Sequence, residues 1–290
     1  MVQSGWTAHL FCAGRGRYTA PLRPPIRARM DDFETPADAS DEAFAAPTRK
    51  RRRGIYLLPN LFTTAALFAG FYAVLAANEG RFEAAALGIF AAMILDGFDG
   101  RIARITHTQS DFGAEYDSLS DMVAFGVAPA LVVYEWALSG LGKLGWLAAF
   151  VYTAGAALRL ARFNTQLGIA DKRYFQGLPS PSAAAIIAGG IWIGTDNAIS
   201  GASVSLLAAV LTMAAGLLMV SNFRYYSFKV LDLHGRVPFM VTVLVMLGFA
   251  LVVLDPPIVL FVMFTGYAIS GPILTVVRRR QTRSRRRRER

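Results

Sequence analysis

The chain has 290 residues, of which 54% are apolar, and it carries a formal net charge of +10 at pH 7. Its mean hydropathy is positive, at +0.40. The apolar runs are far longer than the core helices of a soluble domain, which excludes an ordinary soluble fold. The single cysteine, Cys12, excludes an intramolecular disulfide bond and a metal site built from thiolates.

The first part of the chain differs from the rest. Residues 1–53 contain no apolar run and are rich in Pro, Arg, Ala and Asp, so we predict a disordered extension. Within it, the basic segment 1–29 is followed by an acidic segment that begins at Met30. We therefore hypothesise that Met30 is the true start and that 1–29 come from a misplaced start codon.

Beyond this extension, stretches of about 20 mostly apolar residues recur, which is the length that a helix needs to cross a bilayer. Helices are expected because backbone polar groups find no water in the hydrocarbon layer. The sequence predicts an all-α, polytopic membrane bundle with eight transmembrane helices. The predicted spans are 55–77, 83–105, 117–138, 144–164, 179–196, 203–221, 237–254 and 257–277.

Basic residues gather at alternate turns between these spans, whereas the intervening turns hold only Arg81 and Lys143. This asymmetry is typical of cytoplasmic loops, so we predict that both termini lie in the cytoplasm. The basic runs are expected to contact anionic lipid headgroups rather than nucleic acid. RNA binding through the Arg-rich tail 278–290 is the less favoured alternative.

Four aspartates lie within otherwise apolar sequence: Asp96, Asp99, Asp117 and Asp121. A carboxylate inside a membrane costs roughly 2.5–3.5 kcal/mol on insertion scales. Four of them at regular spacing therefore need a shared partner that offsets this cost. A divalent metal ion is the natural candidate, because hard cations prefer oxygen ligands.

The spacing places these carboxylates on facing helix surfaces. Residues at i, i+3, i+4, i+7 and i+8 share one face of a helix, as 96, 99, 100, 103 and 104 do; 113, 117 and 121 repeat the pattern on the next helix. The intervening residues 105–112 are long enough to reverse the chain. The pattern indicates metal-assisted phosphoryl-group transfer at a membrane surface. Each residue taken alone also fits an ion pathway, an ion pair or helix packing.

The complete pattern, D-x-x-D-G-x-x-A-R-x8-G-x-x-x-D-x-x-x-D, resembles the signature of the CDP-alcohol phosphatidyltransferase family. The resemblance implies six core transmembrane helices, a homodimer and a polar cavity that faces the cytosol. It also implies transfer of a phosphatidyl group from CDP-diacylglycerol to an alcohol, with release of CMP. We expect two ions, Mg²⁺ or Mn²⁺.

Carried over position by position, the resemblance implies that Asp96, Asp99 and Asp117 are metal ligands. Asp121 is then a ligand of the second metal ion and the general base. The positions that match the family's CDP and phosphate contacts are Asn60, Thr63, Gly100, Ala103, Arg104 and Gly113.

Other segments, within 121–129, 158–164, 175–181 and 220–229, resemble the bacterial family members that use L-serine as acceptor and make phosphatidylserine. Arg159 or Arg162 is hypothesised to bind the serine carboxylate. Tyr225 is interpreted as a residue of the membrane interface. The expected location is the bacterial inner membrane, with the active site on the cytoplasmic side.

These comparisons also divide the chain. Residues 54–235 are predicted to form the family core, 236–277 two additional helices for packing and orientation, and 278–290 a cytoplasmic tail. Three alternatives remain open: the same chemistry with glycerol 3-phosphate or inositol phosphate as acceptor, an ion-coupled transporter, and a scaffold.

Overall fold

The structure, a computed structural model, describes residues 57–106, 110–166, 174–226 and 239–288. The predicted extension 1–53, with Met30 and Cys12, lies outside the described residues. The expectations of disorder and of a start at Met30 therefore stay predictions.

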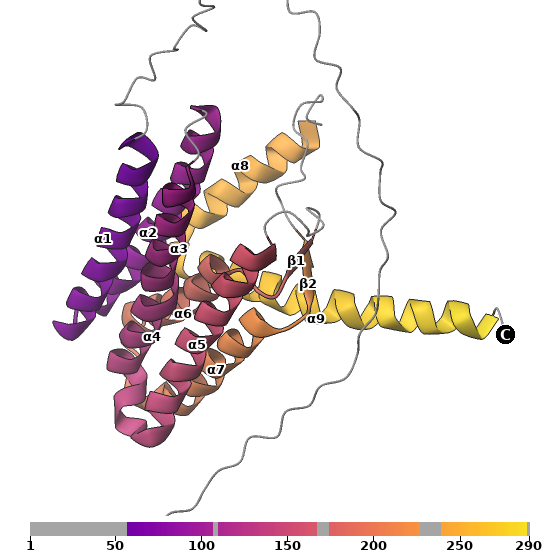
Figure 1. Cartoon of the computed structure of the whole chain (residues 1–290). Coiled ribbons are helices and arrows are strands. Elements are labelled where there is room, and N and C mark those ends of the chain that lie inside the picture. Colours follow the sequence, from indigo (N-terminus) through magenta and orange to yellow (C-terminus); the bar gives the residue numbers. More distant parts are fainter. Residues whose placement is uncertain (1–56, 107–109, 167–173, 227–238, 289–290) are drawn as a thin grey trace, which may run out of the picture. The chain divides into compact units, whose positions relative to one another are not determined.

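Helices account for most of the described chain (Figure 1). Two short strands, β1 (Tyr174–Gln176) and β2 (Arg224–Tyr226), complete it. The helices are α1 (Leu57–Asn78), α2 (Phe82–Ile105), α3 (Asp111–Asp121), α4 (Ala128–Val133), α5 (Lys143–Gln166), α6 (Ser180–Asp196), α7 (Ser205–Val220), α8 (Phe239–Leu254) and α9 (Pro256–Arg288). A π-helical turn, Met122–Val127, joins α3 to α4, and a second one, Tyr134–Leu138, follows α4.

Five helical segments are long and apolar enough to cross a membrane: Pro59–Asn78, Asp111–Leu141, Lys143–Thr165, Gly201–Val220 and Pro256–Thr275. Helices also cover the three other predicted spans. Of these, α2 carries the aspartates, while α6 and α8 are shorter, with 17 and 16 residues. The all-α, polytopic membrane fold is thus confirmed, and the chain is an integral membrane protein.

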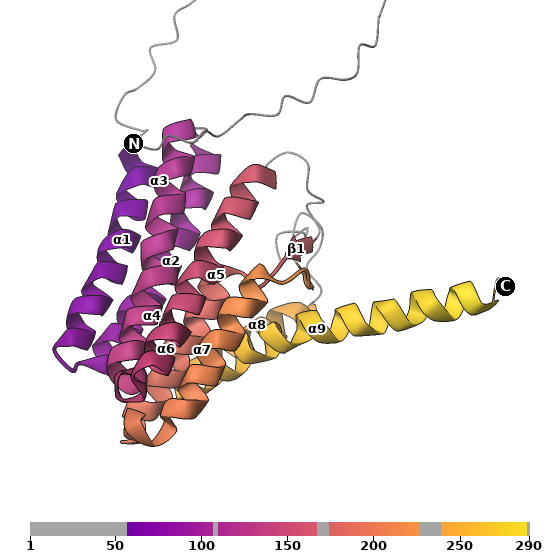
Figure 2. The ribbon, with the colours of Figure 1, turned by 60° about the horizontal axis from the view of Figure 1, so that its bottom comes forward.

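Small residues let the helices of the bundle approach closely, as they do in other membrane proteins. Helix α1 packs along α2 and also contacts α3, and Figures 1 and 2 show the three side by side. At the crossing of α5 and α7, a Cβ added to Gly155 would lie 2.5 Å from the carbonyl oxygen of Gly216. The buried core contains many alanines, among them Ala73, Ala85 and Ala156.

The strands connect the α5–α6 segment to the segment after α7. They pair antiparallel, with Phe175 opposite Tyr225. Gly177 follows β1 with a φ of +82°, and a Cβ there would lie 2.2 Å from the carbonyl oxygen of Met219. Glycine is therefore required at this position, where the chain turns against the end of α7 and enters α6.

The two additional helices correspond to α8 and α9. The apolar part of α9 ends at Thr275, close to the predicted end of the last span at 277, and the helix continues to Arg288. Arginine is a good helix former, and neither Gly nor Pro follows Pro272 in this segment. Figures 1 and 2 show this last part of α9 extending beyond the other helices.

Candidate active site

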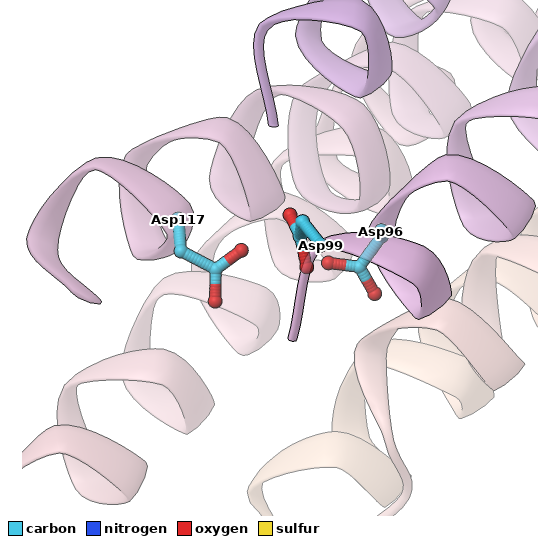
Figure 3. A group of neighbouring side chains, drawn as sticks. All are labelled: Asp96, Asp99 and Asp117. Atoms are coloured by element: carbon cyan, nitrogen blue, oxygen red, sulfur yellow. The ribbon is translucent and has the colours of Figure 1, made fainter. Parts of the chain in front are cut away.

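Three of the four aspartates meet between α2 and α3. One carboxylate oxygen from each of Asp96, Asp99 and Asp117 lies within 4.8 Å of the other two (Figure 3). Asp96 and Asp99 come from the last part of α2, and Asp117 points toward them from α3. Asp99 is only 6% exposed. Three converging hard oxygen donors are the ligand set that Mg²⁺ or Mn²⁺ prefers, so these residues fit a divalent ion.

Hydrogen bonds from α1 fix this arrangement. The Thr63 hydroxyl donates to Asp99 Oδ2 at 2.9 Å, and its oxygen is 3.1 Å from the carbonyl oxygen of Pro59. The Ser120 hydroxyl, from α3, donates to the carbonyl oxygen of Thr63 at 3.1 Å. Helix α1 thus ties Asp99 on α2 to the helix that carries Asp117. A hydrogen bond to a ligating carboxylate orients it before any ion binds.

Asp121 lies outside the group of three but next to it. It interacts electrostatically with Asp96 and Asp117, and its side chain is within hydrogen-bonding reach of Asp96. Asp121 is the last residue of α3, and the π-helical turn begins directly after it. Such wide turns often occur at functional sites.

A proline accompanies this wide turn. In a regular α-helix, the carbonyl of Phe125 would accept the N–H of residue 129, but Pro129 has no N–H. The hydroxyl of Tyr152, a completely buried residue of α5, donates to the Phe125 oxygen at 3.0 Å. Tyr152 therefore supports the turn that follows Asp121.

Glycines leave open space beside the carboxylates. A Cβ added at Gly97 or Gly100 would meet no atom of the described residues within 4 Å. At Gly113 it would lie 3.1 Å from Ser110 Oγ and 3.5 Å from Asn60 Oδ1. Ser110 is the N-cap of α3 and accepts the Gly113 N–H at 3.1 Å. Gly113 thus lets Asn60 and the N-cap approach each other near the start of α3.

The other residues predicted to bind the nucleotide, Asn60, Ala103 and Arg104, lie on α1 and α2. Asn60 lies in the first turn of α1, where its carbonyl oxygen accepts the Thr64 hydroxyl at 2.7 Å. Ala103 and Arg104 belong to the last turns of α2, but their side chains lie outside the described part of the chain. Phosphate binding by Arg104 stays a prediction.

The two candidate arginines have different surroundings. Arg159 donates to the Ser180 hydroxyl at 2.6 Å, and its guanidinium interacts electrostatically with Asp121, Tyr267 and Asp96. Arg162 instead donates to the carbonyl oxygen of Val220 at 3.1 Å and to Asn222 Oδ1 at 3.2 Å. Arg159 therefore faces the carboxylates, whereas Arg162 holds the C-terminal end of α7.

Sequence reasoning missed several residues that build the site. Ser118 and Ser120 lie inside the aspartate motif; Asn164 Nδ2 donates to Ser118 Oγ at 3.2 Å and so joins α5 to α3. Their position within the motif was the available signal. Tyr152 and Ser180 carried no such signal, because their contacts depend on the tertiary fold. The interface interpretation of Tyr225 is wrong, since Tyr225 is completely buried.

Comparison with known proteins agrees with this geometry. The family model described as CDP-alcohol phosphatidyltransferase matches residues 56–220. The chain is 36% identical over 222 residues to a CDP-diacylglycerol–serine O-phosphatidyltransferase of Helicobacter pylori, covering 76% of this chain and 91% of that protein. A Bacillus subtilis protein of the same name is 35% identical over 172 residues, 59% of this chain and 91% of its own length. A Mycobacterium tuberculosis protein of the same name is 42% identical over 149 residues, which cover 49% of this chain and 51% of that protein. The chain belongs to the CDP-alcohol phosphatidyltransferase family.

Proposed function

We propose that this phosphatidyltransferase uses CDP-diacylglycerol as donor and L-serine as acceptor, and that it produces phosphatidylserine and CMP. The observation that carries the proposal is the meeting of three carboxylates from α2 and α3, with the Arg159 guanidinium facing them from α5. The family and the names of the relatives support the same donor and acceptor.

In this proposal, Asp96, Asp99 and Asp117 hold a divalent ion, Mg²⁺ or Mn²⁺, and Asp121 contributes to a second one. When bound there, such ions supply positive charge that stabilises the diphosphate and the departing CMP. The open space beside Gly97 and Gly100 admits the diphosphate close to the α2 backbone. Asn60 and Gly113, which approach each other at the start of α3, contact the cytidine part of the donor.

Asp121 is the proposed general base. It accepts the proton of the serine hydroxyl as the serine oxygen bonds to the phosphorus that carries diacylglycerol. The bond from that phosphorus to CMP breaks, and CMP leaves with the electron pair. Asp121 lies beside the other carboxylates, which is where a base must be placed to reach an incoming hydroxyl.

Arg159 is the proposed partner of the serine carboxylate. A guanidinium binds a carboxylate through two parallel hydrogen bonds, and Arg159 already faces Asp121. Arg162 is less suited to this role, since its guanidinium holds Val220 and Asn222. This difference provides a matched pair of variants: Arg159→Lys is expected to raise the KM for serine far more than that for CDP-diacylglycerol, whereas Arg162→Lys leaves their ratio unchanged.

The test is CMP release by the purified protein in lipid micelles with CDP-diacylglycerol and Mg²⁺ or Mn²⁺. L-serine, glycerol 3-phosphate and inositol phosphate are offered separately as acceptors. We expect release with L-serine and loss of turnover, but not of donor binding, in Asp121→Asn. Release only with another acceptor rejects serine, and no release with any of them rejects the transferase function in favour of a transporter or scaffold.

We also propose that the active site and both termini face the cytoplasm of a bacterial inner membrane. The alternation of basic turns supports this orientation. In a variant with Cys12 replaced by serine, a cysteine introduced at Glu79 is expected to react with an impermeant reagent added outside the cell. One introduced at Ile105 is expected to be protected. The homodimer predicted from the family resemblance is checked by crosslinking in the membrane.

A further inference from the structure

Helix α9 contains a proline that changes its hydrogen bonding. In a regular α-helix the carbonyl of Ala268 would accept the N–H of residue 272, which is proline and has none. The hydroxyl of Tyr225 donates to the Ala268 oxygen instead, at 3.0 Å. In the turn after Asp121, the buried Tyr152 likewise donates to a backbone carbonyl four residues before a proline.

Tyr225 is fixed against α9 by shape as well. It is completely buried, and a Cβ added at Gly271 would lie 2.4 Å from its ring. Burial and then the neighbouring Tyr267 raise the pKa of Tyr225 to about 12, so its hydroxyl remains a donor at neutral pH. Because Tyr225 belongs to β2, it joins α9 to the strand pair that leads into α6.

Tyr267 is placed by this contact. Its ring centre lies 5.4 Å from that of Tyr225, with the planes tilted by 45°. Tyr267 interacts electrostatically with Arg159, as does Asp121. Ser180, the first residue of α6, accepts a hydrogen bond from the same guanidinium. Groups from four elements, α2, α3, α6 and α9, thus surround Arg159.

We propose that α9 forms part of the acceptor pocket, with Tyr267 as a positioning residue that holds the Arg159 guanidinium toward Asp121. Tyr225 fixes Tyr267 through its contacts with Ala268 and Gly271. Both tyrosines lie beyond residue 220, where the family match ends. The inference rests on the proposed function, because it assumes that Arg159 binds the acceptor's carboxylate. It replaces the expectation that the last two helices serve only packing and orientation.

The test compares variants that differ by one hydroxyl. Tyr267→Phe keeps the ring and removes the polar group that faces the Arg159 guanidinium, and it is expected to raise the KM for L-serine roughly tenfold, the equivalent of about 1.4 kcal/mol. The KM for CDP-diacylglycerol and the Tm are expected to stay the same. Thr265→Val is the matched control on α9, because the Thr265 hydroxyl is buried and has no hydrogen-bond partner among the described residues. It should change neither KM.

Tyr225→Phe provides a second route to the same effect. Loss of its bond to Ala268 is expected to raise the serine KM severalfold and also to lower the Tm. In an Arg159→Lys background, Tyr267→Phe should raise the serine KM little further, because both changes act through the same guanidinium. If Tyr267→Phe also lowers the Tm, the ratio of the serine KM to the CDP-diacylglycerol KM is compared in Tyr225→Phe and in Tyr267→Phe with Arg159→Lys. A rise of this ratio in Tyr225→Phe, with little further rise when Tyr267→Phe is added to Arg159→Lys, supports the role of Tyr267.

The outcomes distinguish a failure of the proposed role of α9 from a failure of the proposed function. If the wild-type protein releases CMP with serine but the serine KM of Tyr267→Phe and Tyr225→Phe equals that of the wild type, the role of α9 is rejected and the transferase stands. Equal increases in both KM values also reject it, because a general structural effect then explains them. If the wild-type protein does not use serine, the proposed function fails, and with it the inference that depends on it.

Discussion

Helix α2 carries glycines in both of its halves, but in different surroundings. A Cβ added at Gly88 would lie 3.1 Å from the carbonyl oxygen of Ala69 and equally far from the Cβ of Ala73, both in α1. One added at Gly97 or Gly100 would meet nothing within 4 Å in the part of the chain that the structure describes. The first half of α2 therefore uses glycine to pack against α1, as membrane helices commonly do. The second half leaves space beside the carboxylates, and on the proposed function this space admits the donor.

The comparison predicts that changes in the second half alter activity and changes in the first half alter stability. The strongest test is Asp99→Asn. We expect activity to fall about a thousandfold or more, since loss of roughly 4 kcal/mol of charge stabilisation corresponds to that factor. The fold should persist, because the amide oxygen can still accept the Thr63 hydroxyl. CMP release and Tm are the measurements, with Asp196→Asn, at the exposed end of α6, as control; activity within tenfold of the wild type would contradict the prediction.

A matched pair of valines compares the two halves directly. Gly88→Val forces extra atoms between α1 and α2, and overpacking of this kind costs about 1–3 kcal/mol. Gly97→Val changes helix propensity by the same amount but places the new atoms in open space. The Tm of this variant should therefore stay closer to that of the wild type. Thermal unfolding of both purified variants measures this difference. Equal losses of Tm would show that propensity, and not packing, determines the effect.

Gly100→Ala tests whether the open space is used by the donor. A methyl group there meets no atom among the described residues. The Tm should therefore not fall, and helix propensity favours alanine by about 1 kcal/mol. The KM for CDP-diacylglycerol is expected to rise roughly tenfold, the equivalent of about 1.4 kcal/mol. The KM for serine serves as the internal control, and an unchanged donor KM would place the diphosphate elsewhere.

The smallest expected effect belongs to Thr63→Val, which removes the hydroxyl that donates to Asp99. A hydrogen bond to a charged group contributes about 1.5–3 kcal/mol, part of which a bound ion replaces, so we expect a loss of activity of several-fold. The metal concentration needed for half-maximal activity should rise as well, because the ligand is less well oriented. Thr195→Val, which affects only bonds within α6, is the control.

Much of the fold followed from hydropathy, because a helix that crosses a bilayer must expose apolar side chains over its whole length. The convergence of Asp96, Asp99 and Asp117 followed from their spacing, since i, i+3 and i+4 residues share a helix face. The same spacing predicted that Asp121 lies next to Asp117 on one face of α3, but it did not predict the π-helical turn that begins directly after Asp121. Periodicity arguments assume regular helices and do not detect such a turn.

Contacts between distant segments were equally hidden. Arg159 and Arg162 are three residues apart on one helix, and sequence gave no reason to separate them. The end of α7 separates them: Val220, 58 residues from Arg162 along the chain, accepts a hydrogen bond from the Arg162 guanidinium. The Arg159 guanidinium instead faces Asp121. Tyr225 was misinterpreted for the same reason: its partner in α9 is 43 residues away at Ala268. The aromatic segment around Tyr225 resembles, by composition alone, the aromatic belt found at membrane interfaces.

The placement of Tyr267 late in the chain affects how the enzyme matures. Ribosomes deliver α1 through α5 to the bilayer well before α9 is translated. On the proposed role of Tyr267, a nascent chain at that stage possesses all four acidic groups yet lacks the residue that orients its serine-binding arginine. Full affinity for serine then arises only once α9 has been inserted.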